Sequence, residues 1–577
     1  MKTVIFLWIV LLSLFHTALK AQSPSWLWAG NFGGTKEVRS FSIAVDDAGA
    51  VYTTGSFLGI VDFNPDTTVS FNLTAAGTAN ADLFISKLDS SGNFVWAKNI
   101  GIASEEIGYS LVTDDLANVY VIGVFSGTVD FDPGPNTVNL ISAGAKDVFI
   151  LKLDSSGNFV WARNIGGASE DVGFAVKLDA LNNVLVTGSF TGTADFDPGA
   201  LTYNLTTSGN RDIYVLKLNN AGDFVWAKKM GGSDQDWANA IAVDANGNVY
   251  STGKFAGTAD FDPSPQTSDS ITALQYDDIF VSKLDSSGNH IWAISFPGNG
   301  TDVGNALSAD EPGKLYITGR FAGTADFDPS TSTAFNITSS GGYDNYICKL
   351  TDGGNFVWAK NFDGAADETG QSLAFDPSGN GAIISSGSFS GTTDFNPGSG
   401  TAAITSAGTV DTYISKLDTA GNFVWVKTIG GSDTDYNCFI AKSATGKLYA
   451  AGTFNSLNMT FDTHLVSNIN TTFTAFDVFV AKLDNIPTGI ESISTNYSEI
   501  TLYPNPVSST LHISLPVNSG TFTLSIMDIT GKMVRQLHEV NEQTLTVSTS
   551  DLADGVYVLK ATTSSTSYFS KFIILRN

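Results

Sequence analysis

The stretch Phe159-Val160-Trp161-Ala162-Arg163-Asn164-Ile165-Gly166-Gly167 is one copy of a phrase that recurs along most of this 577-residue chain. Counterparts of its tryptophan occur about every 66 residues, at Trp28, Trp96, Trp226, Trp292, Trp358 and Trp425. Each unit also carries the patterns Val-Tyr-x-x-Gly-x-Phe, Asp-Phe-Asp-Pro and Lys-Leu-Asp-Ser-Ser-Gly-Asn, with small changes. A fixed period of this length indicates a repeat architecture.

Alternating apolar residues predict four strands in the unit around Trp161. The predicted strands are Phe159–Ile165, Phe174–Leu178, Val184–Phe190 and Ile213–Leu218. The turn between two of these strands starts with Asp and ends with Gly-Asn, residues that bond their own backbone or accept a positive φ. Four-stranded units of fixed period, too long for one coil of a solenoid, are typical of β-propeller blades.

The two ends of the repeat array indicate how it closes. The last unit runs to Asp484 without its Phe-Val-Trp strand, and a matching strand stands alone at Trp26–Gly30. Pairing the N-terminal strand with the last unit leaves no open sheet edge. We therefore predict an all-β fold: a seven-bladed β-propeller of four-stranded blades over residues 22–485, with the N-terminal strand closing the last blade, followed by a small β-sandwich.

The repeats resemble the extracellular bacterial β-propeller repeats called SBBP repeats, which are related to NHL blades. The resemblance rests on Gly166-Gly167-Ala168-Ser169-Glu170-Asp171, the strand that follows, Asp179, and the run Val184 to Gly188. It covers residues 22–485. The Asp-Phe-Asp-Pro insertion and the longer period depart from shorter members of the group.

The last part of the chain differs from the repeats. Residues 486–499 are predicted to be a linker, and short alternating strands over residues 500–577 predict a small β-sandwich. The phrases Leu502–Val507, Ser525–Lys532, Leu552–Lys560 and Lys571–Asn577 resemble the type A sorting domain of the type IX secretion system of Bacteroidetes. That resemblance implies that residues 500–577 engage the type IX secretion machinery, and that the domain is cleaved or attached at the cell surface.

The N-terminus and the composition agree with export. A basic start, an apolar run from Val4 to Phe15 and the small residues Ala18 and Ala21 predict a signal peptide over residues 1–21. No segment is predicted to span a membrane. Asp and Glu outnumber Lys and Arg 57 to 30, which gives a formal net charge of −27. A surface of this charge repels phosphate backbones, so we expect no nucleic-acid partner.

A search for chemistry finds no catalytic motif, so we assign no catalytic, cofactor-binding or metal residue and expect no cofactor. One acidic series precedes the first strand of successive units: Glu106, Asp171, Asp236, Asp302, Glu368 and Asp435. A second lies in the Asp-Phe-Asp-Pro turns. Either series would bind calcium, which needs six to eight oxygen ligands, or would cap backbone N–H groups of its own loop. We favour capping for both, with the turn phenylalanine buried. Cys348 and Cys438 are expected to be buried free thiols.

These observations favour a non-enzymatic binding scaffold, secreted or displayed at the cell surface, with an extracellular protein or glycan as ligand. In a repeat protein, features common to all units build the ring, and residues found in one unit define specificity. Such residues include Trp237, Lys254, Arg320 and Tyr343. We favour an ordinary surface role for Lys254 and Arg320, and a local basic spot is the alternative. The alternatives are an extracellular lyase or glycosidase on a propeller scaffold, and a purely structural adhesin component.

Overall fold

The computed structural model describes residues 24–102, 104–309, 313–469, 475–484, 501–514, 522–528, 533–540, 544–562 and 567–576. The chain divides into two compact units, Met1–Ile486 and Pro487–Asn577, which we call the repeat unit and the C-terminal unit. The predicted signal peptide and the linker 486–499 lie outside the described residues.

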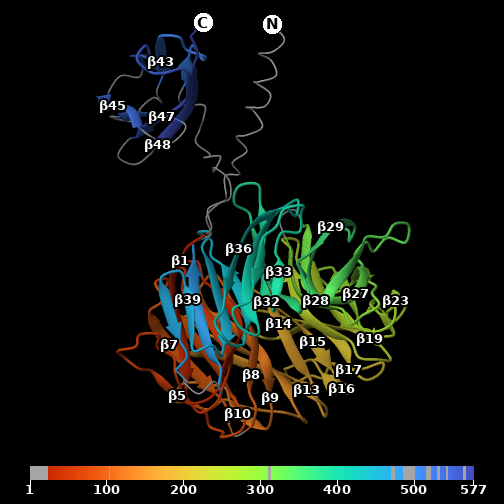
Figure 1. The fold of residues 1–577 in the computed structure, drawn as a ribbon. Helices are drawn as coiled ribbons and strands as arrows, with labels where there is room; N and C mark the ends of the chain where they lie inside the picture. The colour runs from red at the N-terminus through yellow and green to blue at the C-terminus, as the bar shows by residue number, and fades with distance from the viewer. Residues whose placement is uncertain are drawn as a thin grey trace. The chain divides into compact units, whose positions relative to one another are not determined.

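The repeat unit is all-β, and each repeat forms a four-stranded antiparallel sheet (Figure 1). The first strands of the sheets are β2 (Val38–Val45), β8 (Ile107–Thr113), β14 (Val172–Leu178), β20 (Trp237–Val243), β26 (Val303–Ala309), β31 (Glu368–Asp376) and β37 (Asp435–Lys442). The second strands are β3 (Val51–Phe57), β9 (Val119–Phe125), β15 (Val184–Phe190), β21 (Val249–Phe255), β27 (Leu315–Asp326), β32 (Ala382–Phe389) and β38 (Leu448–Phe454).

The third strands are β6 (Asp82–Leu88), β12 (Asp147–Leu153), β18 (Asp212–Leu218), β24 (Asp278–Leu284), β28 (Asn336–Leu350), β35 (Asp411–Asp418) and β41 (Asp477–Leu483). The fourth strands are β7 (Phe94–Ile100), β13 (Phe159–Gly167), β19 (Phe224–Gly232), β25 (His290–Phe296), β29 (Phe356–Asn361), β36 (Phe423–Ile429) and β1 (Trp26–Gly34). The four strands predicted around Trp161 are therefore confirmed as β13, β14, β15 and β18, with ends within two residues of the prediction.

The sequence did not predict the short hairpins that the Asp-Phe-Asp-Pro insertion forms. Their strands are β4 (Ile60–Asp62), β5 (Asn72–Thr74), β10 (Thr128–Asp130), β11 (Asn139–Ile141), β16 (Thr193–Asp195), β17 (Asn204–Thr206), β22 (Thr258–Asp260), β23 (Ser270–Thr272), β33 (Thr392–Asp394), β34 (Ala403–Thr405), β39 (Asn458–Phe461) and β40 (His464–Ser467). In several repeats the hairpin pairs with the end of the preceding repeat's fourth strand, as β4 does with β1; β33 pairs with the two-residue strand β30 (Asp363–Gly364).

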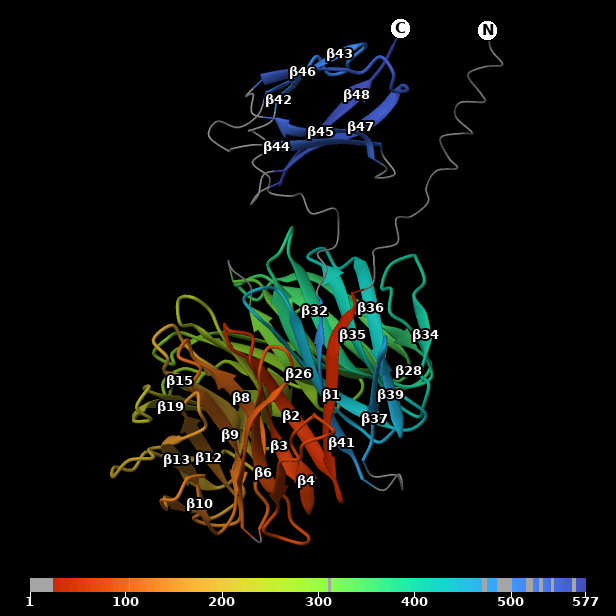
Figure 2. The same cartoon turned by 90° about the vertical axis from the view of Figure 1, so that its left-hand side faces the viewer.

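The N-terminal strand pairs with the last repeat. Strand β1 is antiparallel to β41, with Ala29 opposite Ala481 and Phe32 opposite Val478, and Figure 2 shows it beside the C-terminal strands of the repeat unit. The first strands of neighbouring sheets also contact one another in chain order from β2 to β37, and β37 contacts β2. The lone tryptophan strand at the N-terminus thus occupies the fourth position in the last repeat's sheet.

Each first strand carries a β-bulge that explains the invariant glycine of Val-Tyr-x-x-Gly-x-Phe. In β14 the register shifts between Gly173 and Ala175, opposite Gly188 of β15. A β-carbon on Gly188 would lie 1.9 Å from the carbonyl oxygen of Val172, closer than any side chain can approach. The glycine therefore admits the bulged backbone of the neighbouring strand.

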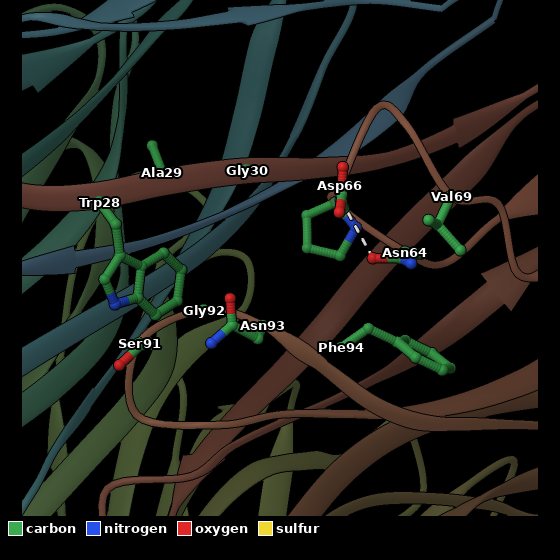
Figure 3. Close-up of a pocket in the computed structure, with 11 residues that line it drawn as sticks. Trp28, Ala29, Gly30, Asn64, Asp66, Val69, Ser91, Gly92, Asn93 and Phe94 are labelled. Atoms are coloured by element: carbon green, nitrogen blue, oxygen red, sulfur yellow. Dashed lines mark hydrogen bonds between the residues drawn. The ribbon is translucent and has the colours of Figure 1, made fainter.

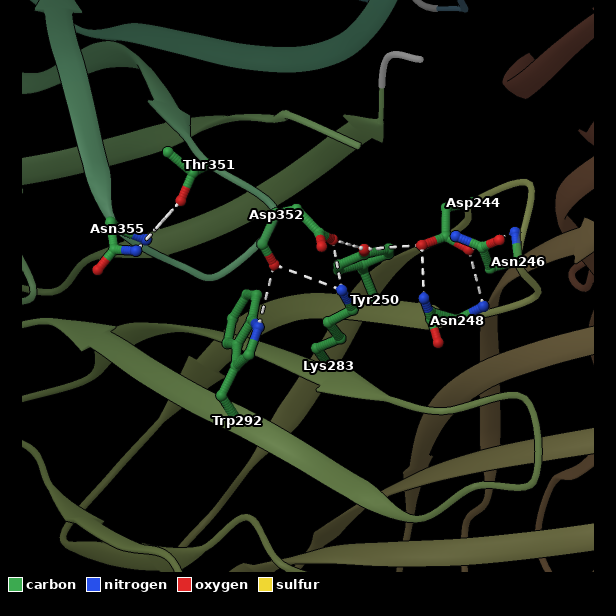
Figure 4. Close-up of polar contacts among 9 residues, drawn as sticks. All are labelled: Asp244, Asn246, Asn248, Tyr250, Lys283, Trp292, Thr351, Asp352 and Asn355. Carbon is green, nitrogen blue, oxygen red and sulfur yellow. Dashed lines mark hydrogen bonds and ion pairs between the residues drawn. The ribbon is translucent and has the colours of Figure 1, made fainter. Parts of the chain in front are cut away.

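The repeated Trp, Tyr and Lys residues meet at a turn of the next repeat (Figure 4). Trp292 Nε1 donates to the carbonyl of Asp352 at 3.1 Å, and Lys283 Nζ, 3.4 Å from that oxygen, lies 5.0 Å from the centroid of the Tyr250 ring. The Tyr250 hydroxyl bridges two carboxylates, Asp244 at 2.9 Å and Asp352 at 2.7 Å. This latch holds adjacent sheets together, which accounts for the recurrence of these three residue types.

The C-terminal unit is a small two-sheet structure, as predicted. One sheet has the order β42 (Thr501–Tyr503), β43 (Thr510–Ser514), β46 (Thr544–Ser548). The other has the order β45 (Met533–Val540), β44 (Phe522–Asp528), β47 (Gly555–Thr562), β48 (Ser567–Ile574). Both sheets supply its buried core, with Leu511 and Ile513 from the first and Leu524, Leu559 and Phe572 from the second.

Candidate functional site

Five of the six acids at or just before the start of the first strands cap backbone N–H groups. Asp171 accepts hydrogen bonds from the backbone N–H groups of Gly167 at 2.7 Å and Thr191 at 3.1 Å, and Asp236 accepts from Gly232 and Ala256 in the same way. Glu106, Asp302 and Asp435 also accept backbone N–H groups, whereas Glu368 accepts the Thr393 hydroxyl. The capping interpretation predicts such hydrogen bonds from backbone N–H groups to the acids. No three of His, Cys, Asp and Glu gather into a metal-sized group among the described residues, and calcium binding stays the untested alternative.

A second buried acidic series escaped the sequence analysis, although it begins the final run of every repeat: Asp82, Asp147, Asp212, Asp278, Asp344, Asp411 and Asp477. Asp147, for example, accepts the Ala143 N–H at 2.8 Å, while its other carboxyl oxygen is buried without a hydrogen-bond partner. This series lies close to the capping acids. A β-carbon on Gly231 would lie 2.9 Å from Asp212 Oδ1 and 2.8 Å from Asp236 Oδ2.

Burial controls the protonation of both series. Loss of solvent raises the pKa of Asp147 to about 6 and those of Asp171 and Asp236 to about 7, although backbone hydrogen bonds lower them in part. The same cause raises the pKa of Glu368 to about 8. These carboxyls therefore exchange protons near neutral pH, and they do so inside the protein.

The Asp-Phe-Asp-Pro turns have the predicted capped structure. Asp195 Oδ1 accepts the N–H groups of Asp197 at 3.0 Å and Tyr203 at 2.8 Å, and Asp62 and Asp130 do the same in their turns. The phenylalanine between the two acids is buried, as at Phe196. Cys348 and Cys438 are buried free thiols, also as predicted.

Lys254 and Arg320, the two cations of the alternative basic spot, each lie over an aromatic ring, and Lys254 also pairs with a carboxylate. Lys254 Nζ lies 2.6 Å from Asp277 Oδ2 and 4.6 Å from the centroid of the Trp237 ring. The Arg320 guanidinium lies 4.4 Å from the centroid of the Tyr343 ring. Both cations are thus held by residues that are themselves singular to their repeats.

A hollow lies elsewhere, beside Trp28 (Figure 3). It has a volume of about 420 Å³. The β1 residues Trp28 to Gly30 form one wall, the Ser91–Phe94 turn and strand start a second, and Asn64, Asp66 and Val69 a third. We call this hollow the Trp28 groove. Its walls combine aromatic faces with amide and carboxylate groups, the mixture found in ligand sites.

A single departure from the repeat explains the groove. The residue two places after each repeat tryptophan is Lys98, Arg163, Lys228, Lys360 or Lys427 in five repeats and Ile294 in a sixth, but Gly30 after Trp28. A larger side chain has no room on that side, because a β-carbon on Gly30 would lie 2.7 Å from Pro65 Cβ. The sequence signal was available as a broken Trp-Ala-Lys phrase, but the hollow depends on a turn from the next repeat.

Two families match parts of the chain. Residues 225–254 match the SBBP family, described as a β-propeller repeat, and residues 501–575 match the family described as a secretion system C-terminal sorting domain. The chain thus carries SBBP-type propeller repeats and a type IX secretion sorting domain. Such a domain implies secretion to the cell surface or the extracellular space, and it implies contact with the secretion machinery.

Two curated relatives each match part of the chain. The chain is 24% identical over 445 residues to an uncharacterized WD repeat-containing protein of Acanthamoeba polyphaga mimivirus, a match that covers 63% of the chain and 31% of that protein. It is 29% identical over 157 residues to the regulatory protein FlaEY of Caulobacter vibrioides, covering 26% of the chain and 16% of that protein. The chain therefore spans a third or less of the length of these relatives.

Solved structures resemble the chain distantly. A protein of unknown function from Dyadobacter fermentans aligns over 80% of the chain and 99% of its own length with a TM-score of 0.34 and 9% identity. The extracellular domain of a putative hybrid two-component system from B. thetaiotaomicron aligns over 93% of the chain and 72% of its own length with a TM-score of 0.19 and 12% identity. In the described part of the chain, no helix has the length and apolar character needed to cross a membrane.

Proposed function

We propose that this protein is a secreted or surface-displayed binding scaffold: a closed, seven-bladed β-propeller, exported through its C-terminal sorting domain, that holds a protein or glycan without transforming it. Closure is supported by the pairing of β1 with β41 and by the contact of β2 with both β8 and β37. The repeated side chains support this ring by holding neighbouring blades together.

The Trp28 groove is the observation that carries the binding role. The recurrent acids are engaged by their own backbone, as Asp171 and Asp236 are, so they serve the framework. The groove, by contrast, lies beside Gly30, where five other repeats have a long basic side chain, and its aromatic and polar walls suit a ligand. A site confined to one blade of a uniform ring is expected of a binding scaffold.

The test presents the purified full chain to a glycan array and to an array of extracellular proteins, and incubates it with the same glycans. Saturable binding without turnover is the expected result. Cleavage of any glycan would overturn the non-enzymatic role, and the absence of binding on both arrays would favour a purely structural component. Gly30→Arg places a basic residue of the kind found in other blades beside the groove, and its melting temperature is compared with that of the wild type because its β-carbon must displace Pro65, 2.7 Å away.

A further inference from the structure

The Trp28 groove has counterparts in other repeats, and there a basic side chain of the chain itself fills it. A β-carbon on Gly157 would lie 3.0 Å from Lys98 Cε and 3.1 Å from the ring of Trp96. Three further turn glycines, Gly222, Gly288 and Gly421, face Arg163, Lys228 and Lys360 in the same way. At Gly92, which faces the Trp28 groove, the three nearest atoms all belong to Trp28, and at Gly354, beside the repeat that carries Ile294, they all belong to Trp292.

Arg163 shows in detail how a cation is held in this position. Its guanidinium lies 5.4 Å from the centroid of the Trp161 ring. Nε donates to the Gly222 carbonyl at 3.0 Å, and a terminal nitrogen donates to the Ala221 carbonyl at 3.0 Å. The residues that correspond to Ala221 and Gly222 at the Trp28 groove are Ser91 and Gly92, and both line it.

A second change accompanies the loss of the basic residue. The residue after the proline of the insertion turn is Gly134, Gly199, Ser264, Ser330 or Gly398 in other repeats, but Asp66 beside the groove. Hydrogen bonds from Thr68 lower the pKa of the Asp66 carboxyl, so it is charged at neutral pH. The repeat of Trp28 therefore lacks the basic residue found in five other repeats and carries an acid at the same place. At the Trp425 position, Lys427 pairs with the acid of the adjoining turn, Asp462, at 2.5 Å.

We propose that the Trp28 groove binds an arginine or lysine side chain presented by a protein partner, which takes the place that Arg163 and its counterparts occupy in other blades. This inference rests on the proposed binding role and names the chemistry of the ligand. The indole face of Trp28 supplies a cation–π surface, the Ser91–Gly92 turn supplies acceptors, and Asp66 supplies the counter-charge. A neutral saccharide would use the aromatic wall but would have no need of Asp66.

The test follows Trp28 by ¹⁹F NMR of the full chain labelled with 5-fluorotryptophan, in which the Trp28→Phe variant assigns its resonance. The probes are N-acetyl-arginine amide, its uncharged analogue N-acetyl-citrulline amide, and lactose. We expect a saturable shift of the Trp28 resonance with the arginine probe and none with citrulline. Asp66→Asn should reduce the affinity for the arginine probe about two- to fivefold, which is the effect of losing one partly exposed charge pair.

Two variants distinguish the binding of a cation in the groove from a change in the structure of the groove. Lys98→Gly should create a second response at Trp96 by vacating the equivalent groove in the next blade. Gly30→Arg should abolish the response of Trp28, and an unchanged melting temperature shows that the displaced Pro65 has not unfolded the groove. A shift with lactose but not with arginine would make the groove a saccharide site and overturn the inference, as would no shift with any probe. A partner found on the arrays that still binds the Gly30→Arg variant would sustain the binding role while rejecting this site.

Discussion

Trp28 and Lys482, which lie near opposite ends of the repeat unit, donate hydrogen bonds to the same backbone oxygen, the carbonyl of Ser90. The distances are 3.3 Å from Trp28 Nε1 and 2.8 Å from Lys482 Nζ. Trp96 and Lys87 share the carbonyl of Ser155 in the same manner, at 3.2 and 3.1 Å. The junction between the two ends of the repeat array thus uses the same latch as an interface inside it.

Trp28→Phe and Trp96→Phe should therefore destabilise the protein by similar amounts. Each substitution removes one N–H donor and part of a packed ring, which costs about 1 to 3 kcal/mol of unfolding free energy. Urea unfolding of the two variants measures these losses. A loss at Trp96 with no loss at Trp28 would show that the terminal strand does not contribute to the cooperative structure.

Gly188→Ala should be among the most damaging single-methyl substitutions in the protein. The added methyl would lie 1.9 Å from the Val172 carbonyl oxygen, so the bulged strand β14 must move away from β15. We expect a loss of about 3 kcal/mol, as for overpacked cores. Gly398→Ala is the control, because its methyl meets only the Asn396 side chain at 3.1 Å, and its effect should stay within about 0.5 kcal/mol. Equal melting temperatures for the two variants would refute the role assigned to the bulge.

Arg576 should stabilise the C-terminal unit. Its guanidinium donates to the carbonyls of Thr549 at 2.7 Å and Leu552 at 2.5 Å, and it lies 3.3 Å from Asp554. Arg576→Ala should cost about 1 to 2 kcal/mol and reduce the secreted fraction of the full chain. Protease sensitivity of the unit in urea measures the first effect. Lys571→Ala, at an exposed position of β48, should change neither quantity.

Sequence reasoning succeeded where the determinants are local. The Asp195 turn and the strand Val184–Phe190 follow from neighbouring residues, because an Asx turn and a buried apolar run are encoded within a few positions. It missed Asp147 and its counterparts because aspartate is usually exposed, and nothing near Asp147 in the sequence marks it as buried. The sequence did not predict the Trp28 groove for a similar reason. Gly30 departs from the repeat pattern in the sequence, but the groove beside it is completed by residues of the next repeat.

The buried carboxyls predict that the protein loses stability as the pH rises from about 5 to 8. Asp171 and Asp236 have pKa values of about 7 in the folded protein, above the value of about 4 expected when unfolded. Between these values the folded state binds more protons, so the unfolding free energy falls with increasing pH until the folded pKa is passed. Melting temperatures at pH 5, 6, 7 and 8 should decrease in that order.

Asp147→Asn tests the source of this dependence, because the amide oxygen retains the bond from Ala143 while the other end of the group no longer ionises. Near pH 4, where the Asp147 carboxyl is protonated, the variant and the wild type should have similar unfolding free energies. Above pH 6 the variant should be the more stable protein, because the asparagine avoids a buried charge. Asp154→Asn is the matched control. Desolvation raises the pKa of Asp154, but hydrogen bonds from Asn158 and Ser156 together outweigh it and lower the pKa, so the stabilising effect of this carboxylate is lost only below about pH 4. If Asp147→Asn left the pH dependence between 5 and 8 as steep as in the wild type, the protons would have to be taken up elsewhere.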